Sequence, residues 1–288
     1  AMLTGGAGML LVILTVTQAA SGGISPVVSG LQSNQWSKIV PLASNRWVPR
    51  MDNSHNDFVM VFLGDLGSLN HKEQLHWKQY NITDGSVSQS CFKRSFEAVF
   101  CDPDTADLFF KQEFDIFQKK WKDKYGWFLF LPLSKDDEHY FKTLRIPTKN
   151  NQKEFDELVL ALTKILIDSL NTSELKKSLI NEQFEENVKK FVKSEFILKK
   201  DDLSIETLKK YLYQKHGLHF QEMIEFMKDL QNLRSTGSAH RKGESYEKIR
   251  RKFNLSDNYK EVFEKILIEC IKIINTLSSK KYGLINGD

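Results

Sequence analysis

The stretch Gln152–Leu170, QKEFDELVLALTKILIDSL, decides the fold of this chain. Its apolar residues recur at steps of three and four, so they form one stripe along a helix of about four turns. The stripe consists of Phe155, Leu158, Val159, Leu162, Ile165, Leu166 and Leu170. A helix with so continuous an apolar face is stable only when other helices cover that face, so this stretch predicts a helical bundle.

The sequence after this stretch repeats the same periodicity. Asn171-Thr172-Ser173-Glu174 ends the first helix and provides a cap for the next one. Four more apolar stripes follow, formed by Val188, Phe191 and Val192; by Ile205, Leu208 and Leu212; by Ile224, Met227, Leu230 and Leu233; and by Val262, Phe263, Ile266, Leu267, Cys270, Ile271, Ile274 and Leu277. We therefore expect an all-α bundle of amphipathic helices over residues 151–288, with the fourth helix ending at Arg234.

The sequence before the bundle has a different pattern. The apolar run Phe58–Leu63 predicts a buried strand, and an aromatic stripe predicts a helix over residues 106–123. Residues 126–132 and 140–147 are interpreted as further strands. Residues 51–150 are therefore predicted to form an α+β domain, and residues 1–50, interrupted by prolines, an irregular segment. The expected chain is predominantly helical overall.

The composition limits the classes of function. A chain of 288 residues with 41% hydrophobic residues suggests two domains, and a formal net charge of +4 gives no argument for nucleic-acid binding from global charge. Three cysteines without ligand-like spacing favour a reducing, cytoplasmic location over disulfides or a metal site, and no cofactor is expected. The apolar run Met9–Val16 is too short to span a bilayer, and no lysine or arginine precedes Lys38, so neither a membrane segment nor a secretory signal is predicted.

The run Asn232–Gly243, NLRSTGSAHRKG, carries the clearest candidate for chemistry. Arg234 and His240 flank small residues that allow close approach of a phosphate. A guanidinium binds phosphate oxygens through its forked donors, and an imidazole can transfer a proton at neutral pH. Attack of a ribose 2′-hydroxyl on the adjacent phosphate requires both groups. Arg234 and His240 are therefore the predicted catalytic pair of an RNA-cleaving site.

A basic segment surrounds this pair. From Arg234 to Lys252 the chain holds seven lysines and arginines against two glutamates, and a local positive surface suits an anionic RNA backbone. The residues predicted to hold the flanking RNA are Arg241, Lys242, Lys248, Arg250 and Arg251.

A C-terminal helical bundle in which an arginine is followed four to six residues later by a histidine resembles the HEPN superfamily of prokaryotic defence and toxin ribonucleases. Glu73–Lys78 and Leu233–Gly243 also resemble segments of bacterial proteins with a HEPN-like C-terminus. The resemblance implies a metal-independent endoribonuclease, with Arg234 and His240 as its catalytic pair and a homodimer that joins two motifs in one site. This sequence has Ser235 where many relatives carry Asn, Asp or His, and Lys242 where nucleotidylated HEPN toxins carry tyrosine.

Two other classes of function stay open from the sequence. The bundle could be a non-catalytic module that binds a nucleotide, RNA or a protein, while the N-terminal domain recognises a separate partner or ligand. It could also be a scaffold in which Arg234 pairs with a carboxylate and His240 caps a turn. Among weaker candidates, Asp136–His139 fits an exposed turn better than a cation site, and the spacing of His71 and His76 does not place both on one helical face.

Overall fold

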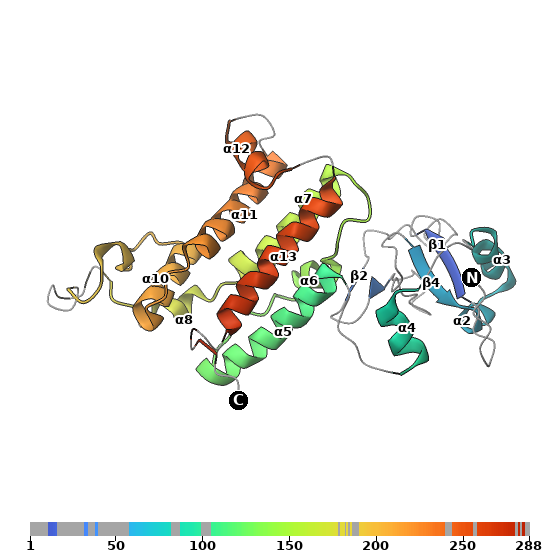
Figure 1. Cartoon of the computed structure of the whole chain (residues 1–288), viewed down its shortest axis with the longest axis horizontal. Coiled ribbons are helices and arrows are strands. Elements are labelled where there is room, and N and C mark those ends of the chain that lie inside the picture. The colour runs from blue at the N-terminus through green and yellow to red at the C-terminus, as the bar shows by residue number, and fades with distance from the viewer. Residues whose placement is uncertain are drawn as a thin grey trace. The chain divides into compact units, whose positions relative to one another are not determined.

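The computed structural model describes residues 11–15, 32–33, 38–39, 58–81, 87–98, 105–177, 179–181, 183, 185, 190–239, 244–255, 258–279, 282 and 284–285. Within these residues the chain is predominantly helical, which confirms the prediction for the overall fold (Figure 1). Contacts divide the described residues into two compact units. The first comprises those up to residue 112 together with 142–148, and the second comprises those in 113–141 and 149–288. The domain boundaries predicted at residues 50 and 150 stay predictions.

The first unit contains two antiparallel pairs of short strands. β1 (Leu11–Thr15) pairs with β4 (Phe58–Phe62), and β2 (Gln32–Ser33) pairs with β3 (Lys38–Ile39). β4 confirms the strand predicted from the apolar run. Its central residues Val59, Met60 and Val61 are all buried, as expected of a strand without polar alternation. The α+β description of residues 51–150 stays a prediction, because 51–57, 82–86 and 99–104 lie outside the described residues.

Three helices follow β4 in the first unit: α2 (Leu63–Gly67), α3 (His71–Gln79) and α4 (Gln89–Phe96). α3 begins with a capping box, in which the Asn70 side chain accepts from the Glu73 amide and the Glu73 carboxylate accepts from the Asn70 amide. Trp77 of α3 and Cys91 of α4 are buried. The Cys91 thiol donates to the Met60 sulfur at 3.5 Å, so α4 covers β4.

α5 (Ala106–Tyr125) confirms the helix predicted from the aromatic stripe. Its first residues belong to the first unit, where the Asp107 carboxylate accepts from the Ile146 amide at 3.0 Å and Lys111 donates to the Lys142 carbonyl. Its later residues belong to the second unit, where Phe117 and Trp121 are fully buried. One helix therefore contributes apolar side chains to two cores.

Two predicted strands are wrong. In residues 126–132 only Phe130 makes a β-bridge, with Leu170, and Gln118 of α5 takes both polar groups of the Phe130 backbone. Residues 140–147 begin inside α6 (Glu138–Thr143) and continue as an irregular segment. Each run is buried only in part, at Leu129 and Phe130 in the first and at Leu144 and Ile146 in the second. Apolar residues alone do not distinguish a strand from an irregular segment that covers a core.

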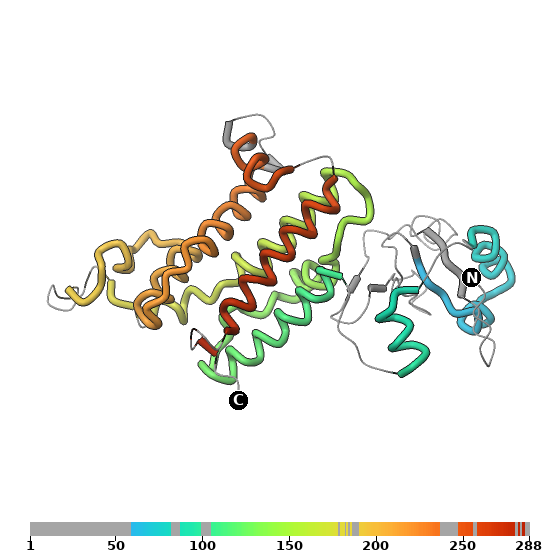
Figure 2. Tube along the Cα trace, viewed as in Figure 1, coloured from blue at the N-terminus to red at the C-terminus, as the bar shows by residue number. Residues whose placement is uncertain are grey.

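The second unit is a bundle of helices around α7 (Gln152–Thr163), which continues into the π-helical turn η2 (Lys164–Asp168). The further elements are α8 (Thr172–Lys176), the 3-10 turn η3 (Ser194–Phe196), α10 (Ser204–His216), α11 (Gln221–Ala239), α12 (Glu244–Lys252) and α13 (Tyr259–Ser278). α7 packs against both α11 and α13 (Figures 1 and 2). The predicted cap is confirmed at α8, where the Asn171 side chain accepts from the Glu174 amide.

Two expectations for the bundle are wrong. Residues 190–193 form turns instead of the predicted helix, and Phe191 is 88% exposed. α11 does not end at Arg234 but continues to Ala239, so the small residues that follow Arg234 are helical. A short set of three apolar residues is too weak a signal for a helix, and serine and threonine can continue a helix by bonding to its carbonyls. The likeness of this bundle to the HEPN arrangement stays a prediction.

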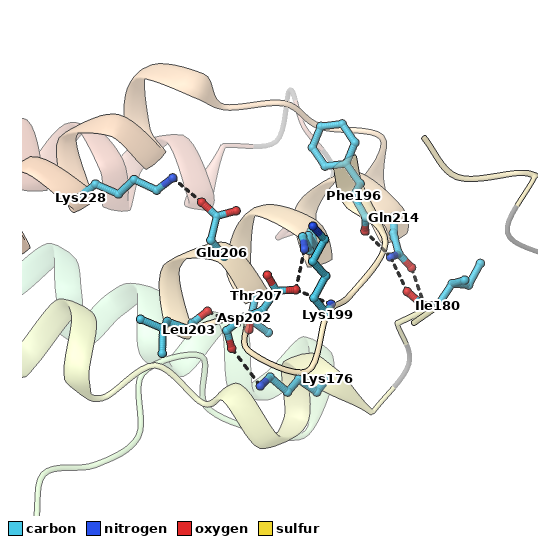
Figure 3. A network of polar contacts seen from close by, with 11 residues as sticks. Lys176, Ile180, Phe196, Lys199, Asp202, Leu203, Glu206, Thr207, Gln214 and Lys228 are labelled. Carbon is cyan, nitrogen blue, oxygen red and sulfur yellow. Dashed lines mark hydrogen bonds and ion pairs between the residues drawn. The ribbon is translucent and has the colours of Figure 1, made fainter. Parts of the chain in front are cut away.

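A partly buried polar network holds α10 in the bundle (Figure 3). The Asp202 carboxylate accepts from the Lys199 amide at 2.6 Å and from the Lys210 ammonium at 2.5 Å, while Lys176 of α8 donates to the Asp202 carbonyl. The Gln214 side chain bonds to the amide and carbonyl of Ile180 and to the Phe196 carbonyl. The network therefore joins three chain segments to α10, and its least exposed pair is Lys210 with Asp202.

Candidate functional site

Arg234 lies on the last part of α11, at the surface of the second unit. One of its guanidinium nitrogens donates to a carboxylate oxygen of Asp168 at 2.7 Å, and the same oxygen lies 3.6 Å from the ammonium of Lys164. The Arg234 and Asp168 side chains are 31% and 32% exposed. Two cations thus share one carboxylate in a setting that solvent can enter. The buried residue Leu233 directly precedes Arg234 and fixes this part of α11 in the core.

The partner of Arg234 comes from an unusual part of the backbone. Asp168 is the last residue of η2, the π-helical turn that follows α7. A π turn places one extra residue in a helix and shifts the residues after it around the axis, and such turns occur frequently at functional sites. Ile165, Leu166 and Ile167 within the turn are buried, so the turn is fixed from inside while Lys164 and Asp168 reach the surface. The fold thereby directs a carboxylate towards α11.

The residues after Arg234 remain helical. The hydroxyls of Ser235 and Thr236 both donate to the Asn232 carbonyl, at 3.0 and 2.7 Å. These bonds satisfy the hydroxyls within the helix, which is how serine and threonine are accommodated there. The predicted proton-transfer residue, His240, lies outside the described residues, and so do Arg241 and Lys242. The structure therefore gives the position of Arg234 but not its geometry relative to His240.

The other predicted RNA-binding residues lie on α12. Lys248, Arg250 and Arg251 are exposed, while Ile249 between them is buried. α12 packs against α11, and Lys252 reaches both carboxylate oxygens of Asp229 on α11, at 2.7 and 2.8 Å. Part of the positive charge of α12 is neutralised within the protein, because Arg250 also pairs with Glu247 at 3.8 Å. α11 therefore contains Arg234 and also packs against the basic helix α12.

The sequence prediction missed Asp168 and Lys164. Their four-residue spacing was a usable signal, because oppositely charged residues at that spacing lie on one face of a helix and mark it as exposed. The contact with Arg234 had no such signal, since it joins residues 66 positions apart and depends on the π turn.

A second group of residues, whose pKa values are shifted, lies at the end of α10 and does not include Arg234. The His216 ring meets the rings of Tyr211 and Tyr125 edge to face, with centroids 5.6 and 6.2 Å apart. Burial lowers the pKa of His216, and the positive charges of Lys124 and Lys215 add to this shift. Burial, with a contribution from Tyr125, raises the pKa of Tyr211 to about 12. Burial also raises the pKa of Tyr125, whose hydroxyl donates to the Leu284 carbonyl at 2.7 Å.

The weaker candidates are accounted for locally. Asp137 belongs to the turn before α6 and bonds to Ser134, while His139 lies in the first turn of α6, where its ring meets the Asp136 carbonyl. Cys91 and Cys270 are buried thiols, and burial raises the pKa of the Cys270 thiol. Among the described residues no three His, Cys, Asp or Glu side chains gather as a metal site would require. Among the same residues, no helix combines the length and the apolar character that crossing a membrane demands.

The whole chain, which includes Arg234 and its partners, was compared with known proteins. The comparison with protein-family models, with curated proteins and with solved structures finds no match for this chain.

Proposed function

We propose that this protein is a metal-independent endoribonuclease of the HEPN type, acting in a bacterial defence or toxin system. Arg234 binds the scissile phosphate and stabilises the negative charge that develops on it. His240 serves as general acid and base. The ribose 2′-oxygen attacks the adjacent phosphorus as its proton leaves, and the 5′-oxygen departs with a proton. The products are a 2′,3′-cyclic phosphate and a free 5′-hydroxyl.

One observation supports this proposal most directly. The arginine of the motif is accessible to solvent, is anchored by its buried neighbour Leu233, and is oriented by a carboxylate from a π turn. Oriented charge is what transition-state stabilisation needs, because the enzyme then spends no free energy on ordering the group during the reaction. The basic helix α12 packs against α11, and it provides a positively charged surface that binds the RNA backbone next to this arginine.

The assembly and the partners belong to the same proposal. The bundle acts as a homodimer in which two copies of the motif face one cleft, and the N-terminal unit recognises a separate partner or ligand. The chain needs no cofactor for the reaction above. We place the protein in the cytoplasm, where RNA is present.

A second candidate function is supported by the same ion pair. An arginine paired with a carboxylate is what the scaffold alternative predicts, and the pair of Arg234 with Asp168 agrees with that expectation. The pair is equally compatible with a module that binds RNA, a nucleotide or a protein without cleaving anything. In both cases RNA stays intact, which separates them from the nuclease.

The test is cleavage of a fluorescent single-stranded RNA by the purified full-length chain in the presence of EDTA. We compare the unchanged protein with Arg234→Ala, His240→Ala and a control, Lys265→Ala, which removes an exposed cation of α13 that pairs with Glu261. The nuclease proposal expects cleavage by the unchanged protein and the control. It expects a loss of about 100-fold to 1,000-fold in each motif variant.

Retained RNA binding by all four proteins without any cleavage would favour the binding module. Cleavage that EDTA abolishes would contradict the metal-independent mechanism. Equal cleavage by the unchanged protein and both motif variants would show that the active residues lie elsewhere. End-group analysis then checks the chemistry, because a 3′-hydroxyl product would exclude attack by the 2′-oxygen.

A further inference from the structure

A cavity of about 500 Å³ lies between the beginning of α11 and the second half of α13. This volume falls within the range of sites that bind small molecules. Phe226 is the lining residue of α11 closest in sequence to Arg234, and it precedes Arg234 by eight residues. That separation is about 12 Å along the helix axis. The cavity is therefore a site of its own, and it is independent of the proposed ribonuclease function.

The apolar part of the cavity suits a hydrophobic or aromatic body. Met223 of α11 and Ile273 of α13 both line it and are themselves almost completely buried. Phe220 and Tyr282 line it too, and their rings meet edge to face with centroids 4.9 Å apart. Methionine adapts its shape to a ligand, and aromatic rings offer faces that attract both apolar groups and cations.

The charged part of the cavity carries an excess of carboxylates. Glu222 of α11 and Glu269 of α13 both line it, together with one lysine, Lys272, and one histidine, His219. The Lys272 ammonium lies 2.6 Å from the Glu269 carboxylate, so its charge is already compensated within the protein. The charge left over is negative. A phosphate or a carboxylate would meet repulsion here, whereas a cation would meet attraction.

The hydrogen-bonding groups point to the same class of ligand. Thr276 lines the cavity, and its hydroxyl donates its proton to the Lys272 carbonyl at 2.7 Å. A hydroxyl has one proton, so towards a ligand this oxygen can only accept. The carboxylates of Glu222 and Glu269 are acceptors as well. A ligand that fits this wall must supply donors, as an ammonium group does.

We propose that this cavity binds an organic ammonium ion with an aromatic or alkyl body. The ammonium group lies between Glu222 and Glu269 and donates to Thr276. The apolar body rests on Met223 and Ile273 and against the ring of Tyr282.

The experiment is a calorimetric titration of the full-length protein at about pH 8, where a histidine of ordinary pKa is neutral and a primary amine is charged. The probes are 2-phenylethylammonium, the uncharged 2-phenylethanol and the anionic 3-phenylpropanoate. They share a phenyl body and differ mainly in charge. The ammonium is expected to bind saturably at one site. The alcohol is expected to bind about threefold to fivefold more weakly, and the carboxylate more weakly still. Equal or tighter binding of the carboxylate, or no binding of the ammonium, would overturn the proposal.

Two variants and a control locate the site. Glu222→Gln is expected to weaken binding of the ammonium about threefold to fivefold. Glu269→Gln should weaken binding of the ammonium further. It should also improve binding of 3-phenylpropanoate, because the positive charge of Lys272 is then no longer compensated by a carboxylate. Glu264→Gln, which changes an exposed residue of α13 outside the lining, should leave all three affinities unchanged. The same affinity in Glu222→Gln, Glu269→Gln and the control, with unchanged thermal unfolding, would place the ammonium elsewhere and refute the site.

Discussion

Two ion pairs of the second unit have the same chemistry but different surroundings. Lys210 and Asp202 meet at 2.5 Å with side chains that are 3% and 8% exposed. Arg234 and Asp168 meet at 2.7 Å with side chains that are about a third exposed. Water can replace a lost partner at the second pair but not at the first. The pair on α10 therefore contributes to the fold, while the pair on α11 can change without unfolding the protein, and this makes it suitable for function.

The largest effect is expected from Lys210→Met. The change leaves the Asp202 carboxylate buried without its cation, and breaking a buried pair on one side costs about 3–5 kcal/mol. The free energy of unfolding, measured by urea denaturation followed by circular dichroism, should fall by this amount. Lys265→Met, which breaks the exposed pair with Glu261 on α13, should leave it nearly unchanged. Similar small changes in both variants would remove the distinction between the two settings.

Gln214→Leu is expected to rank second. The variant keeps the size of the side chain but leaves the amide and carbonyl of Ile180 and the carbonyl of Phe196 without their partner. An unsatisfied buried group costs about 1–3 kcal/mol, and since these groups are partly buried a loss of about 1–2 kcal/mol should appear in the same assay. Gln221→Leu, at an exposed position of α11, serves as the control. A loss in Gln221→Leu as large as that in Gln214→Leu would show that the network in Figure 3 is not what stabilises α10.

Arg234→Ala is expected to separate stability from activity. Because the pair with Asp168 is partly exposed, its loss should lower the free energy of unfolding by less than about 1 kcal/mol. Cleavage of RNA should fall about 100-fold to 1,000-fold, as stated above. Asp168→Asn keeps the shape of the side chain, removes its charge, and should also leave stability nearly unchanged. A loss of several kcal/mol in Arg234→Ala would mean that this arginine serves the bundle and not the reaction.

The smallest effect at neutral pH is expected at His216. Since burial lowers its pKa in the folded protein, the unfolded chain takes up a proton more readily as the pH falls below about 6.5. Above that value both states are neutral at this residue and it contributes no pH dependence. The unchanged protein should therefore lose stability towards about pH 5 more steeply than His216→Phe. Urea denaturation of both proteins across this range measures the difference, and parallel pH profiles would show that His216 is not the group responsible.

The sequence was most informative where the periodicity was long. The periodicity of Gln152–Leu170 predicted a helix whose apolar face is covered by other helices. α7 is that helix, and α11 and α13 pack against it. The periodicity did not reveal η2, because Ile165 and Leu166 match the apolar stripe whether the turn is α or π. Residues 126–132 were mistaken for a strand, since an apolar run indicates burial and not the backbone conformation.

The candidate site was predictable only in part for a related reason. Arg234 was recognisable from its residue type and its neighbours along the chain. Asp168 contacts Arg234 although the two residues are 66 positions apart in the sequence. Elsewhere in the bundle Lys210 is buried, although lysine side chains are usually exposed. Contacts of this kind depend on how helices pack, which no local pattern records. The cavity beside α13 escaped prediction in the same way, because its walls come from separate helices.

The π turn at the end of α7 also limits how this protein can change by insertion and deletion. Deleting one residue within Lys164–Asp168 would restore the regular α-helical period and turn the following residues by about 100° around the helix axis. Asp168 would no longer point towards Arg234, and the buried side chains of Ile165, Leu166 and Ile167 would be displaced with it. The ion pair between these two helices therefore depends on the length of this segment and not only on its composition.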